Sequence, residues 1–121
     1  MQLIKKMEKK LKQARFALMT MFEVLEKDIV EMKSRKQPKV HARMFYNYYL
    51  WKKFNIPHNK IKNHIEGMHH ATSIYLKNKF EYEIEQYDSV GMQWQTFLFF
   101  ADYQEWKQQS NIKEMQTKYI I

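Results

Sequence analysis

The scarcity of glycine and proline restricts the fold of this chain more than any other feature of its sequence. The 121 residues contain only two glycines and two prolines, which are Pro38, Pro57, Gly67 and Gly91. A β-fold with many tight turns depends on these two residue types, because they supply the backbone conformations that turns require. The sequence therefore predicts an all-α protein with about five to six helices and tight connections.

Length and cysteine content narrow the class of protein further. A chain of 121 residues suits a single helical domain over 1–121 with one hydrophobic core. It contains no cysteine, so disulfides and thiolate metal sites are excluded, and we expect a cytoplasmic protein. No apolar run approaches the roughly 18 to 20 residues of a membrane span, and residues 2–12 are too charged for the core of a secretory signal.

Residues 1–34 carry an apolar stripe at alternating steps of three and four. Its members are Ile4, Met7, Leu11, Ala14, Leu18, Met21, Leu25 and Met32, and Asp28 interrupts it between the last two. No glycine or proline occurs before Pro38, so the pattern predicts one long amphipathic helix of about thirty residues. Such a stripe more often covers the rest of its own domain. The alternative is a coiled-coil seam that would form a homodimer through this N-terminal helix.

Residues 38–87 are predicted to form a helix-turn-helix core. Apolar periodicity predicts a first helix over 38–54, which begins at a proline whose fixed φ suits the first turn. A short helix over 58–65 and a longer one over 69–87 follow. Gly67 lies between them and supplies the permissive backbone that a sharp turn between helices requires.

Residues 89–121 are predicted to form aromatic-rich C-terminal helices. Asp88 and Ser89 are candidates to cap the first of these helices, and Ser110 is a candidate to cap a short terminal helix. So many aromatic residues on one helix favour a buried core element over a partner surface.

Charge is distributed unevenly along the chain, whose formal net charge is +8. The window from Met32 to Ile65 contains no Asp or Glu, but it contains nine cations. They are Lys33, Arg35, Lys36, Lys39, Arg43, Lys52, Lys53, Lys60 and Lys62. A long acid-free segment joined to a helix-turn-helix predicts a surface that binds double-stranded DNA, because lysine and arginine neutralise its phosphates. A solvated basic face without a ligand is the alternative.

Residues 33 to about 84 resemble the C-terminal DNA-binding domain of the bacterial replication initiator DnaA, which is a helix-turn-helix of the Trp-repressor type. That family has a basic loop, a helix with an early arginine, a short helix, and a Gly-x-Asp-His-Thr-Thr sequence that opens the recognition helix. The matching segments here are Lys33-Ser34-Arg35-Lys36, Val40-His41-Ala42-Arg43, Ile61 to Ile65, and Gly67-Met68-His69-His70-Ala71-Thr72. The resemblance covers less than half of the chain.

The recognition-helix sequence matches the family only in part. Gly67, His70 and Thr72 match, whereas His69 replaces the family's Asp and Ala71 replaces its first Thr. Both replacements fall on base-reading positions, so the DNA-box specificity of the family is not carried over. The ATPase module of the family has no counterpart here, and an initiator ATPase is not expected.

The pattern and the resemblance together predict two sets of DNA contacts. Side chains at the start of a recognition helix point into the major groove, so the base-contact candidates are His69, His70, Ala71 and Thr72. The candidates for the DNA backbone or the minor groove are Arg35, Lys36, Lys39, Arg43, Lys52, Lys53, Lys60 and Lys62. The resemblance implies that Arg35 or Lys36 enters the minor groove.

Nothing in the sequence predicts catalysis, and we expect no enzyme activity, no cofactor and no metal site. The chain has neither a Gly-rich phosphate loop nor a His-Glu-x-x-His motif. Only His64, His69 and His70 cluster in sequence, and no carboxylate completes a plausible ligand spacing.

Two functions from different classes remain. The first is a small DNA-binding regulator or replication accessory factor of bacterial or phage origin. The second is a helical protein–protein interaction module, such as a phage-type inhibitor of a nucleic-acid-binding partner. A DNA binder should gather its cations on the face of His70 and Thr72, whereas an interaction module should scatter them and expose an apolar patch on the first or fifth helix.

Overall fold

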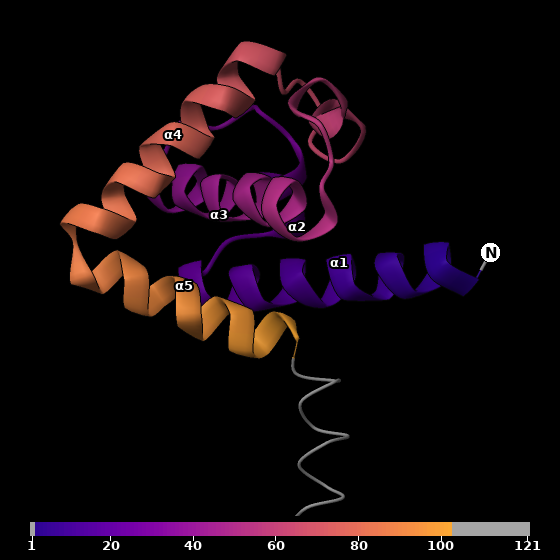
Figure 1. Cartoon of the computed structure of the whole chain (residues 1–121), viewed down its shortest axis with the longest axis horizontal. Coiled ribbons are helices and arrows are strands. Elements are labelled where there is room, and N and C mark those ends of the chain that lie inside the picture. Colours follow the sequence, from indigo (N-terminus) through magenta and orange to yellow (C-terminus); the bar gives the residue numbers. More distant parts are fainter. Residues whose placement is uncertain (1, 103–121) are drawn as a thin grey trace, which may run out of the picture.

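The computed structural model describes residues 2–102, with side chains described from residue 5 onward, and this part of the chain folds into six helices without a β-strand (Figure 1). The helices are α1 (Gln2–Phe22), α2 (Glu26–Val30), α3 (Gln37–Phe54), the 3-10 helix η1 (His58–Asn63), α4 (His70–Gln86) and α5 (Asp88–Ala101). The predicted all-α fold with five to six helices is confirmed. No described helix combines the length and the apolarity that a membrane crossing requires.

The central element is α3, which Figure 1 shows across the middle of the molecule, with α1 and α5 on one side and α4 and η1 on the other. Its buried positions run without a break from Ala42 to Leu50. A helix that is buried on every face must be covered from all directions, unlike a surface helix with a single apolar stripe. The remaining helices therefore form a shell around α3.

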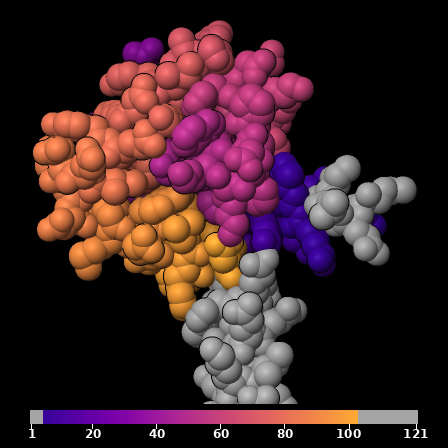
Figure 2. Space-filling model, in the orientation of Figure 1, coloured from indigo at the N-terminus to yellow at the C-terminus, as the bar shows by residue number. Residues whose placement is uncertain are grey.

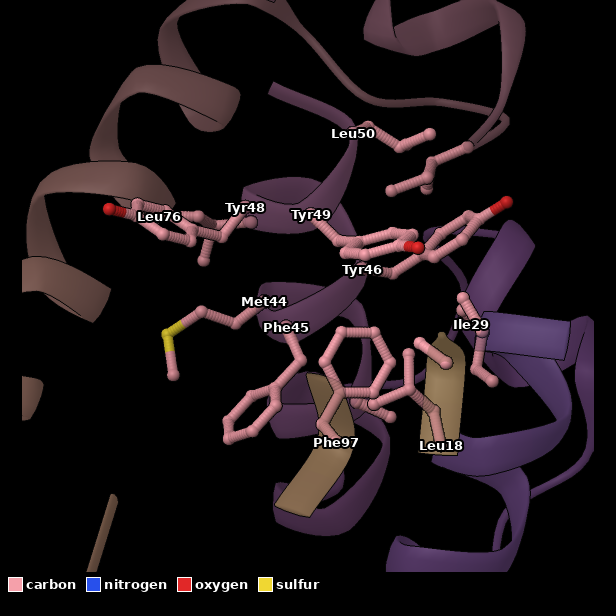
Figure 3. Packing of buried hydrophobic residues seen from close by; sticks show 14 of the residues in the cluster. Leu18, Ile29, Met44, Phe45, Tyr46, Tyr48, Tyr49, Leu50, Leu76 and Phe97 are labelled. Atoms are coloured by element: carbon pink, nitrogen blue, oxygen red, sulfur yellow. The ribbon is translucent and has the colours of Figure 1, made fainter. Parts of the chain in front are cut away.

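The largest fully buried side chains between α3 and this shell are aromatic (Figure 3). The ring of Phe45 on α3 lies 5.1 Å from that of Phe22 on α1, 4.8 Å from Phe80 on α4 and 6.2 Å from Phe97 on α5. All three pairs meet edge to face, which is the arrangement that aromatic quadrupoles favour. One side chain thus joins three helices that are distant in sequence.

The predicted single helix over 1–34 is wrong, because α1 ends at Phe22 and a separate helix, α2, begins at Glu26. Between them Glu23 adopts a left-handed backbone with φ 54°, which costs a non-glycine residue roughly 1–2 kcal/mol. The turn brings Ile29 into the core with no exposed surface, whereas Leu25, a member of the predicted stripe, is 58% exposed. Burial of Ile29 offsets the backbone strain.

The side chain of Asp28 shows why a new helix starts at this point. Its carboxylate accepts a hydrogen bond from the Leu25 N–H at 3.0 Å, which satisfies a backbone donor at the start of α2. The same carboxylate lies 3.2 Å from the ammonium of Lys39 on α3. The hydrogen bond to Leu25, followed by the charge of Lys39, lowers the pKa of Asp28. Asp28 had interrupted the apolar stripe of the sequence, and here it caps a helix.

The helix-turn-helix boundaries agree with prediction to within two residues. The helix predicted over 38–54 is α3, the short helix is a 3-10 turn, and the longer one is α4. The predicted caps at Asp88 and Ser89 are wrong, since the N-cap of α5 is Tyr87 and it makes no side-chain cap. Ser110 and the short terminal helix predicted there lie outside the described residues.

The predicted turn at Gly67 is confirmed by its backbone φ of 86°. A Cβ atom added at Gly67 would lie 3.3 Å from the Cβ of Met32, so a side chain is disfavoured by both conformation and space. Gly91 is the matched contrast, because it lies within α5 and an added Cβ would meet nothing within 4 Å.

We expect opposite effects when each glycine is replaced by alanine. Gly67→Ala should lower the free energy of unfolding by about 1–3 kcal/mol because of backbone strain. Gly91→Ala should raise it by about 0.5–1 kcal/mol, since alanine is the better helix former. Urea denaturation followed by circular dichroism measures both. Equal effects of the two substitutions would contradict the turn described at Gly67.

Candidate nucleic-acid interface

The start of α4 presents the predicted base-contact residues at one end of the molecule. Met68 is 2% exposed and anchors the turn in the core, and His69 then serves as the N-cap without a side-chain cap. His69, His70 and Ala71 are exposed, whereas Thr72 is half-buried. Figures 1 and 2 show this end of α4 and η1 together, away from α5. The first turn contains no acidic residue, so the positive end of the helix dipole is not neutralised there.

Helical periodicity defines which side chains of α4 face outward. His70 and Thr72 point about 200° apart around the axis, so they lie on opposite flanks, and Ala71 lies between them. Residues at steps of four and three from Ala71 share its exposed face, namely Tyr75, Asn78 and Tyr82. These three residues are not among the contacts predicted from the sequence, although their spacing from Ala71 is visible there.

An aromatic and cationic cluster surrounds the flank of α4 that carries His70. The ring of His58 on η1 stacks on Trp51 of α3 at 5.5 Å, and it meets the ring of His70 edge to face at 6.3 Å. The ammonium of Lys77, one turn further along α4 than Ser73, lies 4.8 Å from the Trp51 ring centroid. Lys52 lies 6.0 Å from the same centroid. Lys52, Lys77 and His58 therefore gather around one tryptophan, and His70 joins them through His58.

Beneath this cluster, a buried hydrogen-bond network fixes α4 and η1 against α3. Asn47, with no exposed surface, donates from Nδ2 to the Ser73 carbonyl oxygen at 3.1 Å. The Ser73 hydroxyl donates to Asn47 Oδ1 at 2.8 Å. Since that hydroxyl proton is used, His58 must donate from its protonated Nδ1 to Ser73 Oγ, 2.8 Å away. Neutral His58 therefore carries its proton on Nδ1 and keeps a lone pair on Nε2.

Backbone hydrogen bonds join the end of α2 to the turn before α4. The Glu66 N–H donates to the Val30 carbonyl oxygen at 2.6 Å, and the Met32 N–H donates to the Glu66 carbonyl oxygen at 3.0 Å. They form an isolated parallel bridge. The chain then enters residues 33–36, here called the basic loop, from Met32, which lies beside Gly67. The start of the basic loop and the turn before α4, which are far apart in sequence, are thus joined by hydrogen bonds.

The predicted backbone-contact cations divide into accessible and occupied groups. The accessible ones, all of them exposed, are Arg35, Lys36, Lys52, Lys60 and Lys62. Lys53 forms an ion pair with Asp102 beyond α5, and half-buried Lys39 pairs with Asp28. Arg43 is only 4% exposed, so its assignment as a phosphate contact is wrong. The sequence pattern did not reveal these pairings because the acids lie outside the acid-free window.

Within residues 2–102, no three histidine or acidic side chains approach closely enough to hold a metal ion. His64 lies apart from His69 and His70, and burial, followed by the charge of Arg15, lowers its pKa. The sequence cluster of three histidines is therefore not a cluster of ligands in space.

Comparison with protein-family models, curated proteins and solved structures finds no significant match for this chain. The resemblance to the DnaA domain thus rests on the matching residues themselves.

His58 and His64 make the free energy of unfolding depend on pH in the mildly acidic range. Burial, followed by the charges of His70 and Lys77, lowers the pKa of His58 from its usual 6.5. Because the folded pKa values of His58 and His64 are depressed, their stabilisation is complete above about pH 6.5 and is lost as pH falls through the folded values. The free energy of unfolding should therefore decrease on acidification from about pH 7.5 to about pH 5.5.

The variant His58→Gln should flatten part of that dependence and leave the part due to His64. Nitrogen NMR of the parent should show a neutral His58 with its proton on Nδ1. A proton on Nε2 would contradict the direction of the Asn47–Ser73–His58 network.

Proposed function

We propose that this protein binds double-stranded DNA through its helix-turn-helix and acts as a small regulator or replication accessory factor. The observation that carries the proposal is the bridge between the end of α2 and Glu66, which joins the segment that enters the basic loop to the turn before α4. A duplex that takes the N-terminal turn of α4 into its major groove would then have the basic loop at its backbone or its adjacent minor groove.

Electrostatics supports this proposal and accounts for the sequence-independent part of binding. Lys60 and Lys62 on η1 are exposed, as are Arg35 and Lys36 in the basic loop. Such side chains attract phosphates and release the counterions condensed on the duplex, which makes affinity depend on salt. The acidic residues Glu81, Glu83 and Glu85 occupy the other half of α4, away from its N-terminus. The distribution of charge along α4 thus favours DNA binding at its N-terminal end.

Base reading is assigned to the exposed first turn of α4. His69 and His70 present ring nitrogens that suit the N7 and O6 atoms of purines, and Ala71 presents a methyl group that suits the methyl of thymine. Tyr75 is 61% exposed on the same outward face, and it extends the proposed contact surface beyond the residues predicted from sequence. Thr72 is half-buried and is therefore a weaker candidate than the sequence suggested.

A second function, a protein–protein interaction module, is favoured by a separate observation. Met92 on α5 is 71% exposed, Phe99 and Phe100 are 43% and 44% exposed, and Phe16 on α1 is 63% exposed. The Gln13 side chain of α1 donates to the Phe100 carbonyl oxygen at 3.2 Å, so α1 meets α5 near this apolar surface. Sedimentation at micromolar concentration tests the homodimer form of this alternative, in which Phe16→Ser should restore a monomer.

Duplex binding measured across salt concentrations tests the proposed function. Lys60→Ala or Lys62→Ala should weaken binding to every duplex alike and reduce the slope of log affinity against log salt by about one. The matched control is Lys9→Ala. Lys9 is exposed on α1, so this substitution removes the same charge at a place away from α4. If the parent protein shows no salt-dependent duplex binding, the second function, a protein–protein interaction module, is favoured instead.

Base reading makes a different prediction. His70→Ala should remove about 1–3 kcal/mol of preference at one or two base pairs while leaving the salt slope nearly constant. His41→Ala is the control, since His41 lies on α3 with its ring 6.4 Å from that of Phe22. Competition with duplexes substituted at single positions measures the preference. If His70→Ala binds all duplexes as the parent does, α4 does not read bases through this residue.

A further inference from the structure

We propose that Arg43 is a positioning residue, which holds the basic loop in the conformation that presents Arg35 and Lys36 to DNA. This inference rests on the proposed DNA-binding function. It replaces the direct phosphate contact that the sequence had suggested for Arg43, whose side chain is buried.

The guanidinium of Arg43 is occupied by contacts to the chain around the basic loop. Its Nη2 donates to the carbonyl oxygen of Ser34, within the loop itself. Its Nε donates to the Lys39 carbonyl oxygen at 3.3 Å, and its Nη1 lies 3.5 Å from the sulfur of Met32. One planar side chain therefore touches the residue before the loop, the loop and the first turn of α3. The fixed fork of an arginine suits such a role, and a lysine has no equivalent geometry.

Further contacts hold the two ends and the interior of the loop. Before the loop, Met32 is hydrogen-bonded to Glu66 at the helix-turn-helix. Within it, the Lys36 N–H donates to the hydroxyl of Ser34 at 3.3 Å. After it, Lys39 pairs with buried Asp28. The backbone of the loop is thus held at several points.

The cationic side chains of the basic loop are exposed, whereas its backbone is held by hydrogen bonds. Arg35 and Lys36 are exposed, so they are available to a ligand while their backbone is held. A loop ordered before binding loses less conformational freedom on binding, which increases affinity without any additional contact. Arg43 would thus contribute to DNA binding from a buried position, through Arg35 and Lys36.

The experiment combines Arg43→Lys with the paired substitution Arg35→Ala, Lys36→Ala in a double-mutant cycle on duplex affinity. Arg43→Lys keeps the charge and loses the fork, so positioning predicts affinity weakened about five- to tenfold. In the Arg35→Ala, Lys36→Ala background the same substitution should change affinity less than about twofold, because the side chains it positions are gone. Unchanged affinity in Arg43→Lys, or full additivity with the loop substitutions, would overturn the proposal.

Hydrogen exchange of the full chain supplies a readout that does not depend on DNA. Arg43→Lys should speed exchange of the Lys36 amide while the amides of α4 exchange as in the parent. If the loop loosens but the parent binds no duplex, the proposed function fails and the structural role of Arg43 stands. If exchange at Lys36 is unchanged, the positioning role fails whatever the protein binds.

Ser34→Ala provides a second variant in case Arg43→Lys does not fold. It removes only the hydroxyl that accepts from the Lys36 N–H, near the surface. Faster exchange at Lys36 with a smaller loss of duplex affinity is expected, and that loss should again disappear in the Arg35→Ala, Lys36→Ala background. An affinity loss that persists in that background would overturn the positioning role.

Discussion

Burial of the middle of α3 on every face is the constraint on which the rest of this structure depends. Its residues from Ala42 to Leu50 have no face left for solvent, so α1, α2, α4 and η1 must all pack on it, and α5 reaches it through aromatic rings. Such a core contains polar groups that need partners, because a buried polar group without a hydrogen bond is costly. Arg43 and Asn47, the two most polar members of this buried run, both have hydrogen-bond partners.

The partners of these two residues connect the core with the proposed interface. Asn47 holds Ser73 and through it His58, which sets the position of α4 and η1. Arg43 holds the carbonyl oxygens around the basic loop. The two halves of the proposed DNA surface are thus each fastened to the same helix by one buried polar side chain. The same hydrogen bonds therefore satisfy the buried polar groups of the core and position the proposed interface.

Charge segregation accompanies this arrangement. Lysines and histidines gather around Trp51 and the start of α4, whereas the carboxylate of Glu81 accepts from Lys77 at 2.8 Å and from the Tyr48 hydroxyl at 3.1 Å. Burial, together with this bond to Glu81, raises the pKa of Tyr48 to about 12, so the hydroxyl stays protonated. The acidic half of α4 therefore contributes to packing against α3, and His70 and Ala71 at its other end remain exposed.

The sequence by itself determined the helical class, the boundaries of α3 and α4, and the turn at Gly67. These features follow from local causes, namely apolar periodicity, a proline at a helix start and a glycine with positive φ. Only the tertiary structure decided that residues 1–34 form two helices, because the break at Glu23 is offset by burial of Ile29 and not by any local turn residue. It also decided which cations are accessible. Arg43, Lys39 and Lys53, all on α3, have partners on other segments of the fold, namely Ser34, Asp28 and Asp102, and helical spacing does not encode such pairings.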